Sequence, residues 1–580
     1  MKKAAIALVV LLVTTPLFAM DAYPKTSIAE DLTATWCGYC PRAYAGLDIV
    51  HGEHDFSQFV SVRYYASSGS YGTPEVEARI QYYANPASYP TVVINGTTKF
   101  VGAAASTATT GEPYLSTVGG AMMVPAPVRV EIDSFNPTSG AVSATVTMHS
   151  TTRVLNDDIL LLVLVEDDVT SEHNHVARDL IQETFDLSGA GNTHTTTTSF
   201  VVDPSWNTAK LNAVALVQHA NGSEVLQVGS TFPKPNYELR AMVPSSVTIG
   251  PSTAPTATDV FAVVNTGLAD SYTIELVVDE APPGWQINLE DEFGGTHTIP
   301  YPFALAAGAT TDFHFNVIPT TPGYASFHVE VTSPNLTTPT VIPFAFNSDD
   351  LSIMLVDDDG GEPFEDYFRA ALDGAGIAYG FWDRNLSTLT DDVAQNYDVL
   401  IWNAGLTTPS LDADDKIFVG DFLDAGGALF LSGQDVGWDL NDANPDPVWY
   451  QTYLHATWIR DDTNIMYLDG LMGDPVTGGM ALHIDGGDGA SNQEYPDEIA
   501  AADNDATEIF FYQGDGCGAV RSLDSLTRAR VVYLGFGFEG IDNAQDRSDL
   551  LVNAIAWIGP EVFSDGFEDG STSAWSNVTP

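Results

Sequence analysis

Apolar and polar positions divide the chain into four units with different periodicities. In the first, residues 23–123, short apolar runs alternate with segments of helical periodicity. The predicted elements are strands over 27–34, 59–66 and 90–96 and helices over 41–51 and 73–84. The last strand ends in Asn-Gly, a dipeptide typical of hairpin turns. Strands and helices that alternate with short links predict a central mixed sheet.

Two β units follow. Residues 124–235 show strand-like alternation and apolar runs separated by turn residues, which predicts a β-sandwich. Residues 239–347 are rich in Thr, Pro and Val. Their segments "VFAVVNTG" and "APPGW" resemble the immunoglobulin-like modules appended to bacterial secreted proteins. We therefore expect a second β domain here.

The fourth unit, residues 350–560, returns to alternating strands and helices. Its first strand, in "LSIMLVDDDGG", is continuously apolar and ends in acids and glycines, which is typical of a buried parallel strand. The pattern predicts a doubly wound parallel sheet, and residues 561–580 form a polar tail. The predicted fold class is multidomain, α/β plus β.

The N-terminus has the three-part pattern of a secretory signal peptide, predicted over residues 1–19. A basic start precedes an apolar run from Ala4 to Val13, and cleavage is expected after Ala19 or Ala22. The apolar run is too short to cross a bilayer comfortably. We expect export to the periplasm, the outer membrane or the exterior, without a transmembrane anchor after cleavage.

Charge narrows the classes of partner. The chain has 21 Lys and Arg against 77 Asp and Glu, a formal net charge of -56. Such a field repels nucleic acid and anionic membranes and attracts divalent cations weakly. We therefore expect no nucleic-acid partner, and we interpret most of the charge as solvated surface.

Two of the three cysteines, Cys37 and Cys40, stand at the start of a predicted helix. The unpaired N–H groups and the positive end of the helix dipole favour a thiolate there. Cys37 would attack a substrate disulfide, and Cys40 would resolve the mixed disulfide. Trp36 would cover the site with an apolar face. The partners would be proteins with thiols or disulfides, and no cofactor is required.

The segments "TWCGYCPR" and "YPTVVING" resemble the thioredoxin fold. The resemblance implies that Pro90 follows a cis bond and faces the cysteines, and that Asp31 is a buried carboxylate that shuttles protons. Over residues 25–230 the chain also resembles the Omp28-related exported proteins, through "TPEVEARIQYYANPASYPTVVING" and "VEDDVTSEHNHVARDL". In those proteins a thioredoxin-like domain precedes a β domain.

Other readings of the cysteine pair remain open. A zinc site needs four ligands and the chain has no second Cys-x-x-Cys, whereas a purely structural disulfide would close a very short loop and add little stability. An oxidised pair used only for binding is a stronger alternative. It leads to the second functional hypothesis, a secreted or surface-associated scaffold without enzymatic activity. The redox direction also stays open, because it depends on a potential set by local electrostatics.

Several histidines and acids are candidate metal ligands. His173 and His175, with His149 or His194, have spacing that could bind a metal; the alternative is a turn whose imidazoles bond the backbone. Asp357, Asp358 and Asp359 end a predicted strand where doubly wound folds bind ligands, and could hold Ca²⁺ or Mg²⁺. The alternative is that these acids cap helices and line a loop.

The fourth unit also resembles class I glutamine-amidotransferase-like domains, which place a nucleophilic cysteine in a strand-to-helix elbow. The matching elbow, residues 433–437, carries Asp435 in that position, and a carboxylate cannot form the thioester. Cys517 lies in a Gly-rich turn elsewhere, and the nearest histidines in sequence are His455 and His483. We expect this unit to lack amidotransferase and hydrolase activity.

Overall fold

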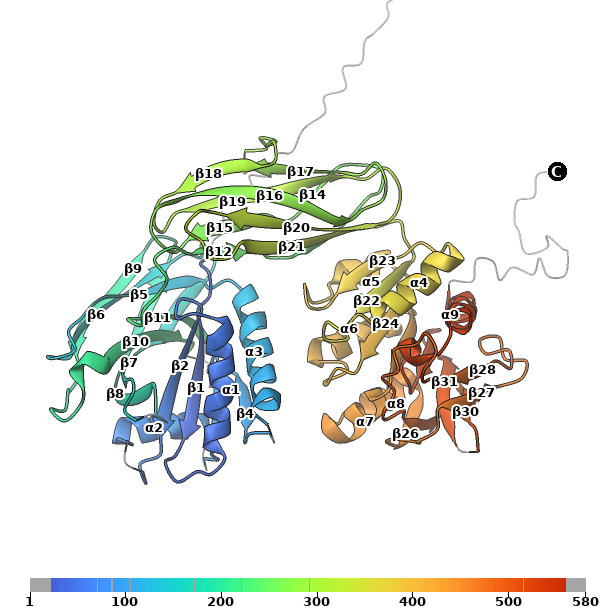
Figure 1. Ribbon diagram of the computed structural model, residues 1–580, viewed down its shortest axis with the longest axis horizontal. Helices are drawn as coiled ribbons and strands as arrows, with labels where there is room; N and C mark the ends of the chain where they lie inside the picture. Colours follow the sequence, from blue (N-terminus) through green and yellow to red (C-terminus); the bar gives the residue numbers. More distant parts are fainter. Residues whose placement is uncertain are drawn as a thin grey trace, which may run out of the picture.

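The computed structural model of the 580-residue chain describes residues 22–559, except 70, 85–86, 105, 171–172, 221, 292 and 515. It is a multidomain protein of several β-sheets with helices packed on some of them (Figure 1). The predicted signal peptide and C-terminal tail lie outside the described residues, so both stay predictions. Within the described part of the chain, no helix is both long and apolar enough to cross a membrane.

The first unit has the mixed sheet that its periodicity predicts. Strand β1 pairs in parallel with β2, β3 pairs antiparallel with β1, and β4 lies at the edge beside β3. Helices α1 and α3 pack on one face and α2 on the other. The bounds are β1 (Ser27–Thr33), α1 (Cys40–Glu53), β2 (Phe59–Tyr65), α2 (Pro74–Tyr83), β3 (Thr91–Ile94), β4 (Thr98–Val101) and α3 (Thr107–Met123).

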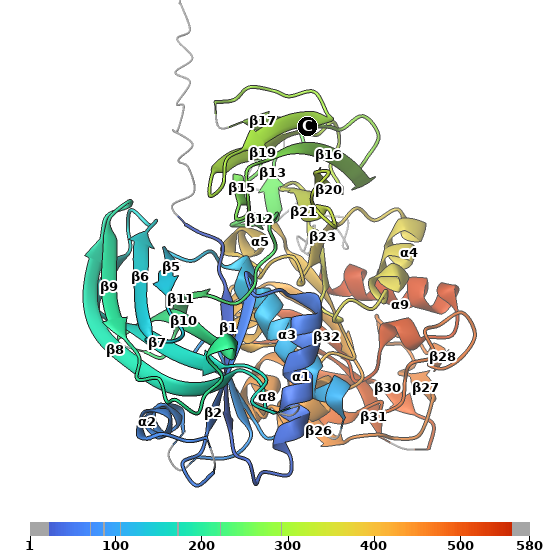
Figure 2. The ribbon, with the colours of Figure 1, turned by 60° about the vertical axis from the view of Figure 1, so that its left-hand side comes forward.

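The sheet of the first unit continues into the next one. Its strand order is β11-β10-β7-β8-β2-β1-β3-β4, and the two parts join where Arg63 of β2 pairs with Val176 of β8. A three-stranded sheet, β5-β6-β9, packs over the far part and encloses a separate apolar core (Figure 2). The bounds are β5 (Val128–Phe135), β6 (Ala141–Met148), β7 (Val154–Glu166), β8 (Val176–Ser188), β9 (Thr193–Ser199), β10 (Leu211–Gln218) and β11 (Val225–Ser230). The join brings the β7–β8 loop beside α1.

The second β unit is a sandwich of two five-stranded sheets around an aromatic core that includes Phe261, Phe315 and Phe344. One sheet contains β12 (Leu239–Met242), β14 (Thr256–Ala257), β15 (Phe261–Asn265), β17 (Gln286–Asp291) and β19 (Thr310–Ile318). The other contains β13 (Val247–Gly250), β16 (Asp270–Glu280), β18 (Tyr301–Leu305), β20 (Tyr324–Thr332) and β21 (Thr340–Ser348). In Figure 1 this unit lies across the top of the molecule, above the N-terminal part on the left and the C-terminal part on the right.

The C-terminal unit contains the predicted doubly wound parallel sheet, in the order β23-β22-β24-β25-β32. Helices α4 and α9 pack on one face, and α5, α6 and α8 on the other. The parallel strands are β22 (Ile353–Asp357), β23 (Gly380–Asp383), β24 (Val399–Gly405), β25 (Ala428–Gly433) and β32 (Arg530–Leu534). The main helices are α4 (Glu365–Ala375), α5 (Asp391–Asn396), α6 (Ala413–Asp424), α8 (Pro447–Leu454) and α9 (Ala544–Ile558).

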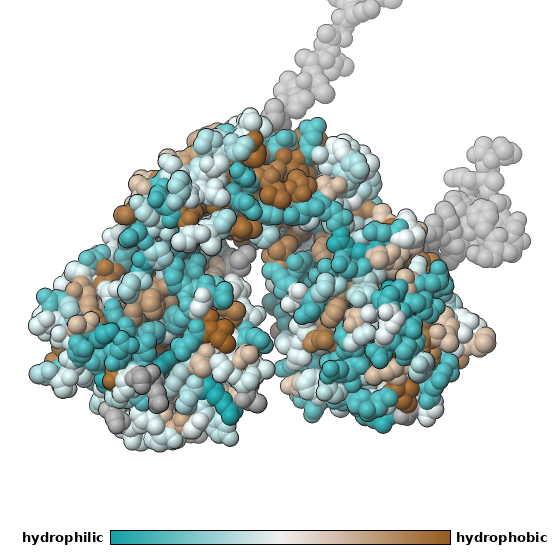
Figure 3. Space-filling model, in the orientation of Figure 1, coloured by the Kyte–Doolittle hydropathy of each residue, from teal (hydrophilic) through white to brown (hydrophobic). Residues whose placement is uncertain are grey.

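An antiparallel extension, which the periodicity did not predict, widens this sheet to eleven strands. Its strands are β26 (Ala456–Arg460), β27 (Tyr467–Gly470), β28 (Ala481–His483), β29 (Glu498–Ala501), β30 (Ala506–Tyr512) and β31 (Cys517–Leu523). Hydrophilic residues cover much of the face shown in Figure 3, which agrees with the solvated acidic surface that the composition predicts.

Candidate redox site

The cysteine pair lies between the end of β1 and the first turn of α1. The two sulfur atoms form a disulfide with an S–S distance of 2.15 Å. The backbone N–H of Cys40 donates to Cys37 Sγ at 3.1 Å, so the start of the helix presents a donor to that sulfur. Tyr39, the N-cap residue, makes no side-chain capping bond, and Pro41 stands at the first helical positions. The N-terminal end of α1 therefore faces Cys37, which favours its thiolate once the disulfide is reduced.

The two cysteines differ in exposure. Cys40 is fully buried, whereas Cys37 is half-buried and lines a pocket. An incoming substrate sulfur can therefore reach Cys37 but not Cys40. Trp36 is exposed, its indole N–H donates to Ser68 Oγ at 3.0 Å, and its ring meets Tyr89 edge to face. Trp36 thus forms a rim beside the pair.

Asp31 lies on β1, two residues before the strand ends and on the face that α1 covers. Its side chain is fully buried, and neither carboxylate oxygen has a hydrogen-bond partner among the described residues. Burial raises the pKa of Asp31 to about 7, and the nearby positive charge of Arg63 offsets only part of that rise. A carboxyl group with this pKa can hold or release a proton near neutral pH.

The Tyr89-Pro90 bond is cis, as predicted. Pro90 is buried and immediately precedes β3, whose first residue, Thr91, pairs with Leu32 near the end of β1. The Trp36–Tyr89 ring contact connects this turn to the cysteine loop. Pro90 therefore lies at the same edge of the sheet as the cysteine pair.

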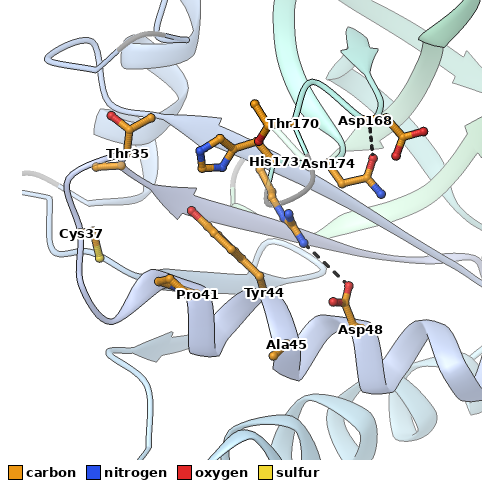
Figure 4. Close-up of a pocket in the computed structure, with 12 residues that line it drawn as sticks. Thr35, Cys37, Pro41, Tyr44, Ala45, Asp48, Asp168, Thr170, His173 and Asn174 are labelled. Carbon is orange, nitrogen blue, oxygen red and sulfur yellow. Dashed lines mark hydrogen bonds and ion pairs between the residues drawn. The ribbon is translucent and has the colours of Figure 1, made fainter.

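A pocket of about 430 Å³ opens beside Cys37 (Figure 4). The first unit contributes Tyr44, Asp48 and Arg63 to its walls. The buried guanidinium of Arg63 lies 4.2 Å from the centre of the Tyr44 ring, and its Nη2 is 3.8 Å from Asp48. The opposite wall comes from the β7–β8 loop, more than a hundred residues further along the chain; its lining residues are Asp168, Thr170, His173 and Asn174. Sequence reasoning did not place this loop at the site.

The four candidate metal-binding histidines are placed separately. His173 Nδ1 lies 2.8 Å from Tyr65 Oη, and His175 Nδ1 lies 2.7 Å from Ser61 Oγ. His149 packs against the Tyr23 ring, while His194 bonds to Glu183 at 2.8 Å. His173 and His175 thus bond hydroxyl groups of β2, and the described residues do not bring His149 or His194 to them. His173 instead forms part of the pocket beside Cys37.

The possible nucleophile and the possible bases of the C-terminal unit each bond to other partners. Cys517 is buried and its thiol donates to the Ala519 carbonyl at 3.0 Å. His455 pairs with Asp503 at 2.8 Å and His483 with Asp542 at 3.1 Å. Burial raises the pKa of Asp435 to about 6. The lack of amidotransferase and hydrolase activity stays a prediction.

Cys517 should resist alkylation in the folded protein. Burial raises its pKa to about 12, so the reactive thiolate is scarce at pH 8. We expect iodoacetamide at that pH to leave Cys517 unmodified in native protein and to modify it after denaturation. Mass spectrometry of tryptic peptides measures both states. Rapid native labelling would show that Cys517 is accessible and would reopen the question of a nucleophile in this unit.

Comparisons with known proteins place no family on this site. No protein-family model and no curated protein matches the chain. Solved structures that match a part of it include a PapD-like domain of human CEP192 (15% identity, 20% of this chain and 89% of that one, TM-score 0.14). A conjugative transposon lipoprotein from Bacteroides eggerthii matches at 14% identity over 20% of this chain and 99% of its own, with a TM-score of 0.15. Likenesses at such TM-scores carry no argument about fold or function.

Proposed function

We propose that the protein is an exported thiol–disulfide oxidoreductase that acts on other proteins through Cys37 and Cys40. The observation that carries this proposal is the asymmetry of the pair, an accessible Cys37 at the helix start and a buried Cys40, together with a buried Asp31 on β1 that has no hydrogen-bond partner among the described residues. The arrangement of β1–β4 and α1–α3 and the cis bond before Pro90 agree with the thioredoxin-like resemblance. For the C-terminal unit, we propose an amidotransferase-like fold without the nucleophile.

The exchange reaction needs no electron carrier beyond the two sulfur pairs. In the reductive direction, the Cys37 thiolate attacks one sulfur of a substrate disulfide, that S–S bond breaks, and a substrate thiolate leaves. The Cys40 thiolate then attacks Cys37 Sγ, the mixed disulfide breaks, and the second substrate sulfur leaves as a thiolate. Two electrons have passed to the substrate, and the Cys37–Cys40 disulfide is formed. The same steps in reverse order oxidise a substrate dithiol.

Asp31 would accept the proton that the buried Cys40 thiol must lose during these reaction steps. Cys40 must lose its proton before it can attack, but it is fully buried and so has no direct contact with bulk water. A carboxylate with a pKa of about 7 can accept that proton near neutral pH and return it in the reverse direction. Asp31 would therefore act in the resolving step rather than in the first attack.

Labelling after mild reduction tests the assigned roles. We expect iodoacetamide at pH 7 to modify Cys37 at least about tenfold faster than Cys40, because Cys37 is accessible and faces the helix N-terminus. Peptide mass spectrometry over a time course measures the two rates. Equal rates would contradict the assignment of Cys37 as the attacking thiol.

Trapping separates exchange from the scaffold hypothesis. The Cys40→Ala variant should accumulate mixed disulfides with insulin, a model disulfide substrate, because the resolving thiol is missing. The Cys37→Ala variant is the matched control and should trap none. If Cys40→Ala traps no more than this control and the wild-type protein does not reduce insulin, the oxidised pair is used for binding or structure, and the scaffold hypothesis is favoured.

A further inference from the structure

A second cluster of chemically active groups lies in the C-terminal unit, at the carboxyl ends of β22 and β24. These neighbouring strands continue into α4 and α6, which pack on opposite faces of the sheet. The crevice between such strands is where doubly wound folds bind ligands. Asp357 ends β22, and Asn403 lies directly beside it in the parallel register.

Strand alternation decides which acids enter this cluster. Asp357 and Asn403 occupy positions whose side chains point to the α4–α9 face, as do Leu355 and Ile401 two residues earlier. Asp358 points to the other face, where it accepts a hydrogen bond from the Trp402 indole N–H at 3.1 Å. The three consecutive acids therefore do not form one ligand set.

Glu365, the first residue of α4, completes a compact group with Asp357 and Asp359. One ligand oxygen from each of the three lies within 4.8 Å of the others. Asp359 is held in place by the backbone N–H groups of Gly361 and Phe364 and by the Asn403 amide. In contrast, Asp357 Oδ1 and Glu365 Oε2 are buried and have no hydrogen-bond partner among the described residues.

Two fully buried side chains border this group and also have an oxygen without a partner. The side-chain N–H of Asn403 donates a hydrogen bond to Asp359 at 3.0 Å, while Asn403 Oδ1 has no hydrogen-bond partner among the described residues. Glu539 accepts hydrogen bonds from Asn492 and Gln493 through Oε1, and its Oε2 is unsatisfied. Glu539 lies in the turn after β32, and its neighbour Phe538 stacks on Phe368 of α4 with ring centroids 4.4 Å apart. Unsatisfied buried oxygens are costly, and several at one place indicate a missing positive partner.

Within the described residues, no basic side chain forms an ion pair with this group, and the charge of Arg369 acts on Glu365 only from a longer distance. None of Asp357, Asp359, Glu365 and Glu539 forms an ion pair there. Arg369, one turn along α4, instead bonds to Glu280 and Tyr324 of the second β unit.

We propose that Asp357, Asp359 and Glu365 bind a Ca²⁺ ion, with Asn403 and Glu539 at its border. Carboxylate and amide oxygens are the ligands that hard cations prefer, and nitrogen or sulfur ligands typical of zinc and copper are not part of the group. The three ligand oxygens are close enough to contact one ion, because all lie within 4.8 Å of one another. Ca²⁺ takes about six to eight oxygen ligands in flexible geometry, whereas Mg²⁺ usually keeps several waters and binds through one or two carboxylates, so a group of three carboxylates beside an amide oxygen favours Ca²⁺.

Calcium titration of the metal-stripped full-length protein tests this site. At about 150 mM KCl, which screens the acidic surface, we expect isothermal titration calorimetry to show one saturable Ca²⁺ site and weaker Mg²⁺ binding. Glu365→Gln and Asp357→Asn should each weaken Ca²⁺ binding about tenfold or more. Hydrogen exchange should show Ca²⁺-dependent protection at the end of β22 and the start of α4, which does not depend on thiol chemistry.

Two neighbouring acids provide matched controls. Asp366→Asn removes an exposed charge from the same turn of α4, and Asp358→Asn removes a charge from the other face of the sheet. Both should leave Ca²⁺ binding unchanged. The proposal is overturned if no saturable site appears, if the controls weaken binding as much as Glu365→Gln and Asp357→Asn do, or if Mg²⁺ binds more tightly than Ca²⁺.

Discussion

Replacing Arg79 with methionine should destabilise the N-terminal sheet by about 3–5 kcal/mol. Arg79, on α2, donates Nε and Nη2 to the two oxygens of Glu30 on β1, each at 2.8 Å, and Nη1 to Gln218 on β10 at 2.7 Å. Glu30 is fully buried and Arg79 nearly so. Removal of the guanidinium leaves a buried carboxylate without its charge partner, and it also breaks the link between α2 of the first unit and β10 of the next one.

Hydrogen exchange of the full-length protein measures this effect locally, since several units need not unfold together. Protection of the β1 and α2 amides should fall by about two to three and a half orders of magnitude in Arg79→Met. The double variant Glu30→Leu/Arg79→Met removes both charges and should recover much of that loss, because it leaves no unpaired ion. If Arg79→Met lowers the stability by less than about 1 kcal/mol, the Glu30–Arg79 pair contributes no more than a weak, solvent-screened ion pair does.

The main elements of the first unit could be predicted because its strands are buried. The predicted strands over 27–34 and 59–66 end within one residue of β1 and β2. Helix α3 had no such signal: it is rich in Thr and Gly and contains Pro113, all unfavourable for helices. Its local indicator is the Ser106 capping box, which uses Thr109 in place of the usual Glu or Gln.

The parts of the site that depend on chain contacts far apart in sequence could not be predicted. Cys37 and Cys40 are recognisable from local spacing, but the pocket wall around His173 exists only because β8 pairs with β2. In the C-terminal unit, Asn403 reaches Asp359 only because β24 pairs with β22, a contact that no local pattern encodes. The opposite orientation of the Asp358 side chain could have been predicted from the sequence, because side chains alternate along a strand.

Replacing Asp31 with asparagine should stabilise the folded protein above pH 7 by up to about 4 kcal/mol. Each tenfold change in an acid dissociation constant corresponds to about 1.4 kcal/mol, and the folded-state pKa is about 7 against an ordinary 3.8. The folded state therefore binds more protons than the unfolded state between these pH values, so the wild-type protein loses stability as pH rises from about 4 to 7. Above that range the loss is complete and constant, and below pH 4 both states are protonated.

The Asp31→Asn variant cannot ionise, so its advantage should be small at pH 4 and largest at pH 8. Hydrogen exchange of the β1 amides, corrected for intrinsic rates at each pH, measures the difference. The same variant should slow insulin reduction by about a hundredfold, because the Cys40 thiol loses its proton acceptor, while alkylation of Cys37 changes little. An equal stability difference at both pH values would show that ionised Asp31 is not the cause. Unchanged turnover would show that another group or water, not Asp31, accepts the proton from Cys40. The buried carboxylate would then lower the stability of the protein without a role in exchange.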